Sequence, residues 1–497
     1  MPKLQELLEA IPGSIRPGRI KVVAGNTNIT IAGIAYHSQK VKPNFLFVAM
    51  NGSKTSGTKF IGEAIRNGAV AVVVPSNRQV SSSSDAKVTY IQVENPRIFL
   101  AQVAHAFYNF CARKMVLIGI TGTNGKTTTT YLVKSILDTA GKVCGLLGTI
   151  QHFDGENWLK AENTTPESLD IIQILVKLEQ KGIRYCVLEV SSHALELNRV
   201  YGLPFKVAVF TNLTQDHLDF HKTFEAYKKA KLKLFESLDQ NATAILNCDD
   251  DLFDEITTIT KAKIVRYSLS EPKAKDAEVT AKILNLTPYG TNVMLNIEGK
   301  EARVNLRLPG RHNVYNLLAA AGVGYSLNIP LNTIKTGIEK VKFICGRLER
   351  VENNKGLQVF VDYAHSPDAL KNLITTAREF SPKRVMVLFG CGGNRDKTKR
   401  PIMGRIATEL ADYVVITSDN PRDEDPLEII EEIKSGINKT NFTIIPDRYT
   451  AIKHILTFAK TGDTVLVAGK GHEDYQIIGA KRQHFDDKEI VKRILRG

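Results

Sequence analysis

The sequence predicts an α/β protein with three domains: a small α/β domain, a central phosphate-loop domain with a parallel sheet, and a C-terminal Rossmann-like domain with an open sheet. A length of 497 residues suggests about three domains of roughly 150 residues each. From residue 115 onward, short apolar runs alternate with amphipathic or polar segments, as in parallel α/β domains. We place the domains at residues 1–112, 113–345 and 346–497.

Composition excludes several classes of protein. Hydrophobic residues make up 43% and charged residues 24%, which is ordinary for a globular protein. The formal net charge is +14, but the basic residues are dispersed, so we expect no nucleic-acid partner. A generally basic surface and attraction of small polyanionic substrates both explain this charge.

The cysteines and the N-terminus indicate the compartment. The six cysteines form no CxxC pair, which argues for a reducing compartment and against a disulfide framework or a zinc site. The start, MPKLQELLEAIPG, lacks a basic segment followed by an apolar core. No apolar run approaches the ~18 residues that a membrane span needs. We therefore expect a cytoplasmic protein without membrane insertion.

Within each predicted domain, apolar runs indicate the strands. Residues 1–112 contain IKVVAG, NFLFVAM and AVAVVVP, a helix-like FIGEAIRNGA, and a serine run at 81–84 before Asp85 that predicts a surface loop. The central domain opens with MVLIGI, a Gly/Thr loop and the helix YLVKSILDTAG, and continues with YCVLEV, VAVFTNL and TAILNCDD. The third domain contains LQVFVDYAH, RVMVLFGCGG, YVVITSDN and TVLVAGKG, and we expect functional loops at the carboxyl ends of these strands.

The loop after MVLIGI has the residues of a phosphate-binding loop. Glycines let the backbone fold tightly so that amides face an anion, the helix start adds positive potential, a lysine reaches the β- and γ-phosphates, and a threonine binds magnesium. These residues are Gly122, Thr123, Asn124, Gly125, Lys126, Thr127 and Thr128. The strict pattern GxxxxGK[ST] has glycine where this chain has Ile120, so the loop is a variant. We expect the chain to act on a nucleoside triphosphate.

The segment GTNGKTT resembles the ATP loop of the Mur ligases and of their relative folylpolyglutamate synthase. The resemblance covers nearly the whole chain and is strongest from about residue 116 to 475. It implies ATP as the nucleotide and an amide-forming ligase activity. Further segments bear on the substrates and the metal.

Glu189 ends a predicted strand, where a carboxylate beside a phosphate loop suits magnesium, although the segment would also serve as a plain polar loop. The segment EVSSHAL resembles the family segment in which Glu189 matches a metal ligand and Ser191 contacts the incoming peptide. Arg199 matches an arginine that binds the same substrate, and His217, in FTNLTQDHLDFH, matches a metal-binding histidine. With Thr127, the resemblance implies two magnesium ions.

Lys231, in AYKKAKLKLF, would from spacing alone be a solvated helix lysine. The resemblance implies instead that CO2 carbamylates it, so that it ligates the second magnesium and helps to position the precursor. Two metals beside a triphosphate favour anionic oxygen ligands over another cation.

Other segments match precursor and nucleotide sites of the family. Asn163, Thr164 and Thr165 match the segment that grips the precursor's peptide, although these residues would also form an ordinary turn. The resemblance implies that residues 1–112 bind the UDP of the precursor. The family triplet D-S-R there is His37-Ser38-Gln39, so only Ser38 is retained.

Two segments are expected at the nucleotide. Asn313 and Asn316, in LPGRHNVYN, match the family's GxHNxxN segment at the adenine, where an amide side chain both donates and accepts; helix capping is the alternative. Arg347 matches an arginine that reaches the ATP phosphates. Asp362 and His365, in DYAHSP, match residues that face the nucleotide and metal.

The segment DNPR bears on the choice of amino acid. An arginine offers two bonds to a carboxylate and repels an ammonium, so it favours meso-diaminopimelate over lysine. The segment resembles the diaminopimelate-adding branch of the family, although it would also form a proline turn. The residues that match this amino-acid site are Arg395, Asp419, Asn420, Pro421, Arg422, Gly469 and Glu473.

The expected reaction is therefore ATP-dependent ligation of meso-diaminopimelate to UDP-N-acetylmuramoyl-L-alanyl-D-glutamate through an acyl phosphate, as a step of peptidoglycan synthesis. The alternatives are the same reaction with L-lysine, a folylpolyglutamate-synthase-like ligase, and a nucleotide-switched binding protein that makes no product. We expect the enzyme to act as a monomer, with Lys126, Glu189, His217, Lys231 and Arg347 as catalytic residues.

Overall fold

The computed structural model describes residues 1–11, 20–52, 55–78, 87–381 and 383–496. The chain forms two compact units. The first contains Met1–Ile118 and Val143–Lys206, and the second contains Gly119–Lys142 and Val207–Gly497. Strand β6 (Val116–Thr121) begins in the first unit and ends in the second. The serine run at 81–84, for which we expected a surface loop, lies outside the described residues.

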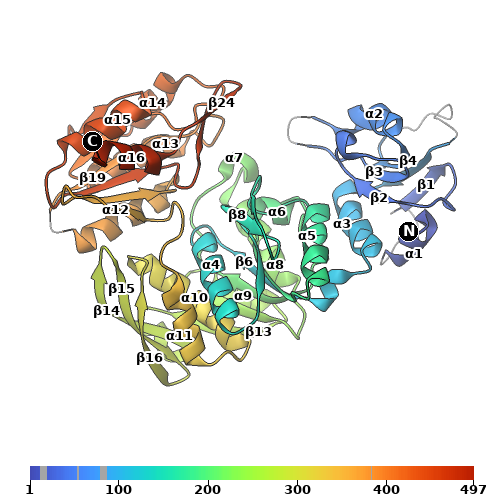
Figure 1. Ribbon diagram of the computed structural model, residues 1–497, viewed down its shortest axis with the longest axis horizontal. Coiled ribbons are helices and arrows are strands. Elements are labelled where there is room, and N and C mark those ends of the chain that lie inside the picture. Colours follow the sequence, from blue (N-terminus) through green and yellow to red (C-terminus); the bar gives the residue numbers. More distant parts are fainter. Residues whose placement is uncertain (12–19, 53–54, 79–86, 382, 497) are drawn as a thin grey trace. The chain divides into compact units, whose positions relative to one another are not determined.

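The first unit starts with a five-stranded sheet in the order β1-β5-β4-β3-β2, coloured blue in Figure 1. Only β1 is antiparallel to its neighbour; the other pairs are parallel. The three strands and the helix expected here are confirmed. The elements are α1 (Leu4–Ala10), β1 (Ile20–Ala24), β2 (Gly33–Ala35), β3 (Phe45–Val48), α2 (Ile61–Arg66), β4 (Ala69–Pro75), β5 (Thr89–Val93) and α3 (Pro96–Phe107).

The rest of the first unit places Glu189 at the end of a buried strand. Strand β10 is parallel to β7, while β8 and β9 extend β7 in antiparallel fashion. Helix α5 packs on α3, so its apolar stripe is buried. The elements are β7 (Cys144–Leu147), β8 (Gln151–Phe153), β9 (Trp158–Lys160), α5 (Ser168–Gln180), β10 (Tyr185–Glu189) and α6 (Ser192–Glu196).

The second unit contains the phosphate loop and the helices that support it. Strands β11 to β14 are successively parallel, but β15 and β16 are antiparallel, so the expected parallel sheet is only part of the sheet. Helices α10 and α11 pack on α4 (Figure 1). The elements are α4 (Lys126–Thr139), β11 (Phe205–Phe210), α7 (Leu218–His221), α8 (Phe224–Glu236), β12 (Thr243–Asn247), α9 (Phe253–Ile259), β13 (Lys263–Ser268), β14 (Val279–Thr287), β15 (Gly290–Ile297), β16 (Lys300–Leu306), α10 (Arg311–Ser326) and α11 (Leu331–Lys340).

The C-terminal part of the second unit has three layers: an open sheet in the order β17-β18-β22-β19-β20-β21, and helices on both of its faces. All neighbours are parallel except β17 with β18. Helices α12 to α14 bury their apolar faces in one core cluster, and α15 and α16 bury theirs in another. The elements are β17 (Glu349–Val351), β18 (Gln358–Asp362), α12 (Pro367–Phe380), β19 (Val385–Phe389), α13 (Lys399–Leu410), β20 (Tyr413–Ile416), α14 (Pro426–Lys434), β21 (Phe442–Ile444), α15 (Arg448–Phe458), β22 (Thr464–Ala468), β23 (Tyr475–Ile478), β24 (Lys481–His484) and α16 (Asp487–Arg496).

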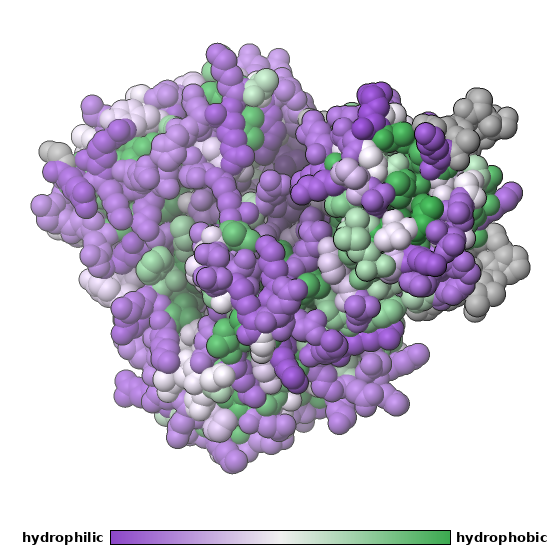
Figure 2. Space-filling view, turned by 45° about the vertical axis from the view of Figure 1, so that its right-hand side comes forward, coloured by the Kyte–Doolittle hydropathy of each residue, from purple (hydrophilic) through white to green (hydrophobic). Residues whose placement is uncertain are grey.

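The surface agrees with the composition. The face drawn in Figure 2 is covered mainly by hydrophilic residues, with apolar residues scattered between them. Among the described residues, each helix is too short or too polar to cross a membrane.

Candidate active site

The segment between β6 and α4 forms a tight loop that only glycine permits. Gly122 and Gly125 have φ angles of 147° and 86°. A Cβ atom on Gly122 would lie 1.9 Å from Thr211 Oγ1, and one on Gly125 would lie 2.2 Å from Asn316 Oδ1. The turn therefore leads directly into the first amides of α4, where the helix dipole favours an anion.

Two lysines meet at one carbonyl of this loop. Lys126 Nζ donates to Gly122 O at 2.9 Å and to Thr123 O at 2.8 Å, and Lys231 Nζ donates to Gly122 O at 2.7 Å. Lys231 is only 1% exposed, so the solvated position indicated by its spacing alone is wrong. Burial, followed by repulsion from Lys126, lowers the pKa of Lys231 well below its ordinary value. The loop is thus contacted by two lysines, one of which, Lys231 of α8, has a lowered pKa.

The segment after β11 fixes the conformation of the phosphate loop. Asn212 Oδ1 accepts a bond from Asn124 N at 2.9 Å, and Thr211 Oγ1 donates to Asn124 O at 2.6 Å. Thr123 Oγ1 accepts from Thr214 N at 2.9 Å. These polar groups satisfy the loop backbone without a regular ladder, so they hold its shape.

Two carboxylates near this loop were missed in the sequence. Asp368 Oδ2 accepts bonds from Asn124 Nδ2 at 2.8 Å and Thr214 Oγ1 at 3.2 Å. Asp216 precedes His217, and its Oδ2 lies 3.8 Å from His217 Nε2. Both carboxylates lie beside residues that were singled out, but no spacing in the sequence indicated these contacts.

Asp216 also connects the β11 segment electrostatically to the C-terminal part of the second unit. Burial raises the pKa of Asp216, but His217, His365 and Lys399 outweigh burial and bring this pKa to about 2. Within the residues the structure describes, no group of three or more His, Cys, Asp or Glu side chains is placed to hold a metal ion. The expected ligands Thr127, Glu189, His217 and Lys231 therefore stay a prediction.

The two asparagines expected at the adenine bond to each other. Asn316 Nδ2 donates to Asn313 Oδ1 at 3.0 Å, and Asn313 Nδ2 donates to Pro309 O at 2.8 Å. Both are buried, and Asn316 also accepts from Thr129 of α4 at 3.4 Å. They lie beside the phosphate loop, and their role in reading adenine stays a prediction.

Arg347 lies against the start of α4, where a phosphate contact was expected. Its Nη2 donates to Thr127 Oγ1 at 3.1 Å, and its guanidinium lies 4.7 Å from the centroid of the Tyr363 ring. Thr128, next along α4, is also buried. Arg347 is thus fixed between the phosphate loop and the DYAHSP segment.

Asp362 and His365 lie in the DYAHSP segment. Burial raises the pKa of Asp362, against the opposing effects of Arg347 and of two backbone bonds that the carboxylate accepts. Burial, with Lys399 nearby, lowers the pKa of His365. Burial also brings the pKa of His472 to about 3, and its ring packs against Tyr363 at 4.9 Å. The rings of His365 and His472 both pack against Tyr363, and Arg347 lies over the Tyr363 ring.

In the first unit, Glu189 is fully buried and its carboxylate is fixed by a threonine. Thr149 N donates to Glu189 Oε1 at 2.8 Å, and Thr149 Oγ1 donates to Oε2 at 2.9 Å. Thr165 Oγ1 donates to Glu189 O at 2.7 Å and accepts from Ser191 N at 3.1 Å. The expected segments around Thr165 and Ser191 are thus brought together with Glu189, while Thr149 was missed.

Arg199 and its neighbours form an ion-pair network. Arg199 Nη1 donates to Thr165 O at 2.9 Å, and its Nε lies 3.0 Å from Glu167 Oε1. Arg97 pairs with the same carboxylate at 2.9 Å. Asn163 is exposed and Thr164 half-buried.

Ser38, the retained residue of the uridine triplet, bonds within the N-terminal sheet region. Its Oγ donates to Glu63 Oε2 at 2.7 Å, and its O accepts from Asn67 at 2.9 Å. Ser38 is buried, whereas His37 and Gln39 are exposed. A contact of Ser38 with uridine stays a prediction.

The loops after β20 and β22 form a cluster of opposite charges, which we call the 419–473 cluster. It contains Asp419, Asn420, Arg422, Lys470 and Glu473. Asn420 Nδ2 donates to Glu473 Oε2 at 2.8 Å, and Lys470 Nζ lies 3.5 Å from Glu473 Oε2. Burial and then Asp419 raise the pKa of Glu473.

Glycines allow the cluster to form, and its arginine is held by the backbone. A Cβ on Gly469 would lie 2.6 Å from Asp419 Oδ2. Arg422, with φ of 53°, donates through Nη1 to Gly393 O at 2.9 Å. A Cβ on Gly392 would lie 2.9 Å from Arg422 Nη1 and 3.8 Å from Arg395 Cγ, so both arginines flank Gly392. Arg395 itself is exposed.

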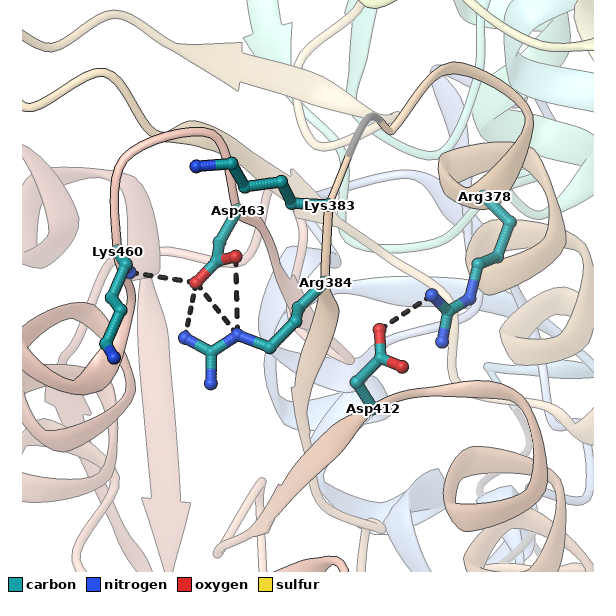
Figure 3. A pocket seen from close by; sticks show the side chains of 6 residues that line it. All are labelled: Arg378, Lys383, Arg384, Asp412, Lys460 and Asp463. Atoms are coloured by element: carbon teal, nitrogen blue, oxygen red, sulfur yellow. Dashed lines mark hydrogen bonds and ion pairs between the residues drawn. The ribbon is translucent and has the colours of Figure 1, made fainter.

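A cavity of 480 Å³ lies at the end of the C-terminal sheet where the strands start. It is lined by ion-paired side chains (Figure 3). Arg384 pairs with Asp463 at 2.5 Å, and Arg378 pairs with Asp412 at 2.6 Å. Arg384, Asp412 and Asp463 each precede the first residue of a strand, whereas the 419–473 cluster follows strand ends. None of the expected site residues lines this cavity.

A glycine loop between a buried strand and a helix, beside parallel strands, defines the chain as a P-loop α/β protein. Three family models match it: "Mur ligase family, catalytic domain" over residues 30–108, "Mur ligase middle domain" over 120–324, and "Mur ligase, glutamate ligase domain" over 346–471. The chain belongs to the Mur ligase family and is a ligase.

Relatives match over almost the full length. The UDP-N-acetylmuramoyl-L-alanyl-D-glutamate--2,6-diaminopimelate ligases of Clostridium tetani (strain Massachusetts / E88) and Caldanaerobacter subterraneus subsp. tengcongensis are 42% and 43% identical over 99% of each chain. A solved structure of a ligase with the same name is 30% identical, has a TM-score of 0.67, and covers 100% of this chain and 99% of its own. The MurF ligase of Thermotoga maritima in complex with ADP is 20% identical with a TM-score of 0.65, over 93% of this chain and 96% of its own, and supports the fold.

The bonds from Thr149 to Glu189 predict a stability effect. Replacing Thr149 with Val removes the hydroxyl donor to a buried carboxylate, which should lower the free energy of unfolding by about 1–3 kcal/mol. Urea unfolding followed by the fluorescence of Trp158, the single tryptophan and part of the same unit, measures this change.

Thr149→Ser is the matched control because it keeps the hydroxyl. We expect it to lose well under half as much stability as Thr149→Val. Equal losses in both variants would show that methyl packing, rather than the bond to Glu189, stabilises this site.

Proposed function

We propose that this ligase uses ATP to join meso-diaminopimelate to UDP-N-acetylmuramoyl-L-alanyl-D-glutamate, forming the UDP-linked tripeptide of peptidoglycan synthesis. The observation that supports this most directly is the glycine loop at which Lys126 and Lys231 meet, because such a loop suits a triphosphate. The names of the two bacterial relatives describe the same reaction, and the 419–473 cluster suits a zwitterionic amino acid.

Each domain has a separate role in this proposal. Residues 1–112 hold the UDP end of the precursor, residues 113–345 hold ATP, and residues 346–497 hold the amino acid. All of these sites lie in one chain, so we propose that the enzyme acts as a monomer. The six cysteines form no CxxC pair, which suits a reducing compartment, and we place the enzyme in the cytoplasm.

ATP is the proposed phosphate donor, and several groups suit it. The first-turn amides of α4 and the side chain of Lys126 would hold its β- and γ-phosphates, and Arg347 would approach the γ-phosphate. Asn313 and Asn316 would hold the adenine, and Asp362 and His365 would face the nucleotide from the C-terminal part.

Magnesium fits the donor types present, and its proposed ligands are Thr127, Glu189, His217 and carbamylated Lys231. A threonine hydroxyl next to the P-loop lysine, a carboxylate at a strand end and a buried lysine with a lowered pKa are compatible with oxygen-rich Mg2+ sites. The metal would neutralise charge on the triphosphate oxygens during transfer.

Lys231 is suited to carbamylation. Its neutral Nζ lone pair would form a bond to the carbon of CO2, one C=O electron pair would move to oxygen, and the amine would release one proton to solvent. The product is a carbamate anion. Because burial already favours the neutral amine, the ordinary cost of deprotonating a lysine is small here.

The peptide end of the precursor would lie near Glu189. Asn163, Thr164 and Thr165 border this region, and Ser191 and Arg199 bond to Thr165. The guanidinium of Arg199 would attract the carboxylates of the precursor, since it is always charged and planar.

The proposed chemistry has two steps. A carboxylate oxygen of the precursor attacks the γ-phosphorus, the bond to the bridging oxygen breaks, and ADP leaves with an acyl phosphate formed. The amine of diaminopimelate, after losing a proton, attacks the acyl carbon, and the bond to the phosphate oxygen breaks as phosphate leaves. Lys126 and Arg347 stabilise the charge that spreads over the transferring oxygens.

The 419–473 cluster would select the amino acid. Its carboxylates Asp419 and Glu473 suit the ammonium of the far end, and Arg422, with Arg395 nearby, suits the extra carboxylate that lysine lacks. Pro421 and Gly469 shape the backbone around these groups.

Product formation tests the proposed reaction. The enzyme with ATP, Mg2+, the UDP-linked dipeptide and meso-diaminopimelate should release ADP and phosphate and yield the tripeptide by mass analysis. Lys126→Ala should lower kcat by at least about a hundredfold, because a charge-stabilising donor is lost.

Three results would contradict the proposal. ADP release that requires neither the dipeptide nor the amino acid would indicate a nucleotide switch. Undiminished turnover by Lys126→Ala would remove the loop from the mechanism. Incorporation of L-lysine in preference to diaminopimelate would support the lysine-adding alternative.

Carbamylation of Lys231 predicts dependence on CO2. Removing dissolved CO2 should lower activity, and bicarbonate should restore it. The lowered pKa of Lys231 means that the neutral amine persists to a pH below the usual lysine range, and the carbamate is lost as the pH falls through that pKa. Labelled bicarbonate should give a carbamate NMR signal that the Lys231→Ala variant lacks. Carbamylation would be contradicted if neither the activity nor the NMR spectrum changed when CO2 was removed or added.

Arg422 is predicted to discriminate between amino acids. Arg422→Ala should raise KM for meso-diaminopimelate about ten- to a hundredfold, because hydrogen bonds to charged groups contribute about 1.5–3 kcal/mol. KM for ATP should not change. Arg405→Ala, which alters an exposed arginine of α13, is the control and should behave as wild type. An unchanged ratio of kcat/KM for diaminopimelate and lysine would refute the role of Arg422.

A further inference from the structure

Arg448 is a fully buried arginine that no sequence pattern singled out. It is the first residue of α15, and its side chain is 0% exposed. A buried guanidinium is costly unless its charge is paired and its N–H groups are bonded. The partners of Arg448 therefore indicate what keeps it in the core.

Asp487, the first residue of α16, pairs with Arg448 and is equally buried. Arg448 Nε lies 2.8 Å from Asp487 Oδ1, and Nη2 lies 2.6 Å from Oδ2. This parallel pair of bonds fixes the plane of the guanidinium. The two remaining contacts of Arg448 therefore have a fixed direction.

Those two contacts are backbone carbonyls. Arg448 Nη1 donates to Ser418 O at 3.2 Å, and Nη2 donates to Ala468 O at 3.0 Å. Ser418 immediately precedes Asp419, and Ala468, the last residue of β22, immediately precedes Gly469. One side chain thus joins the starts of both loops that form the 419–473 cluster.

The sheet itself does not join these loops. The strand order is β22-β19-β20, so β19 lies between the two strands from which the loops emerge. Further bonds join the segments that follow β20 and β22: Gln476 Nε2 donates to Asp419 O at 2.8 Å, and Arg422 N donates to Ile477 O at 3.1 Å. Arg448 is therefore a direct link at the base of both loops.

The charge of Arg448 also couples it to the 419–473 cluster. Burial would lower the pKa of Arg448, but Asp487, with further effects from Asp419 and Glu473, raises it. The cluster holds two carboxylates close together, which is unfavourable without a nearby cation. Lys470 and Arg422 are such cations within the cluster, and Arg448, bonded to the starts of both loops, is a further one.

We propose that Arg448, oriented by Asp487, is a positioning residue that sets the separation of the two loops and thereby the selection of the amino acid. The proposal rests on the proposed function, in which the 419–473 cluster binds diaminopimelate. A shift of this spacing would misplace the carboxylates and Arg422 together, since active-site groups tolerate displacements of only about 0.5 Å.

Steady-state kinetics of the full-length enzyme test the proposal. Arg448→Lys keeps the charge but loses the fork, and should raise KM for meso-diaminopimelate about ten- to a hundredfold, leaving KM for ATP within about twofold. The preference for diaminopimelate over lysine in kcat/KM should fall. Asp487→Asn should act in the same direction but less strongly.

Arg384→Lys is the matched control. Arg384 also makes a forked pair with an aspartate, Asp463, but at the starts of the strands, whereas the cluster follows the strand ends (Figure 3). It should lower the thermal midpoint without changing either KM. If Arg448→Lys does not fold, Asp487→Asn and the charge-free Arg448→Met/Asp487→Leu variant provide the same comparison.

The outcomes separate the two proposals. If the wild type forms no product with either amino acid, the proposed function has failed and this inference with it. If the wild type is active and the variants at Arg448 and Asp487 match Arg384→Lys, or raise both KM values equally, only the positioning role is refuted. A rise confined to the amino acid supports it.

Discussion

The structure depends above all on the positive potential at the turn between β6 and α4. Gly122 and Gly125 bring the chain into the helix so tightly that a side chain would collide with neighbouring residues. Lys126 and Lys231 both donate to Gly122 O, and the start of α4 adds the positive end of its dipole, so this position favours an anion. Polar groups after β11 then bond to the loop, and Asn316 of α10 bonds to Thr129 of α4, so residues far apart in sequence converge on these few positions.

The C-terminal sheet divides its charged groups between its two ends. At the strand starts, ion pairs such as Arg384 with Asp463 bond mainly to each other and to nearby backbone. At the strand ends, the carboxylates of the 419–473 cluster lie close together and the pKa of Glu473 is raised. Two carboxylates held close together repel each other, and such unfavourable arrangements are typical of binding sites.

Much of this was predictable, for a physical reason. Buried parallel strands are continuous apolar runs, so MVLIGI, YCVLEV and TVLVAGKG marked β6, β10 and β22, and a glycine loop after the first of them marked the phosphate site. The strands β14 to β16 were missed because their apolar residues alternate with polar ones and form no continuous apolar run. Thr149 and Arg448 were missed because their partners lie 40 and 39 residues away, at Glu189 and Asp487, and neither pair has a fixed spacing.

The same limit explains the behaviour of the lysines. From sequence, Lys231 is one of several lysines on an amphipathic helix, and only the fold shows that α8 turns this one into the core beside Lys126. Two ammonium groups at one carbonyl repel each other, and burial removes the water that would screen them. Burial, followed by repulsion from Lys126, therefore lowers the pKa of Lys231 well below its ordinary value. The fold thereby favours loss of a proton from Lys231, and the proposed carbamylation depends on this difference between the two neighbouring lysines.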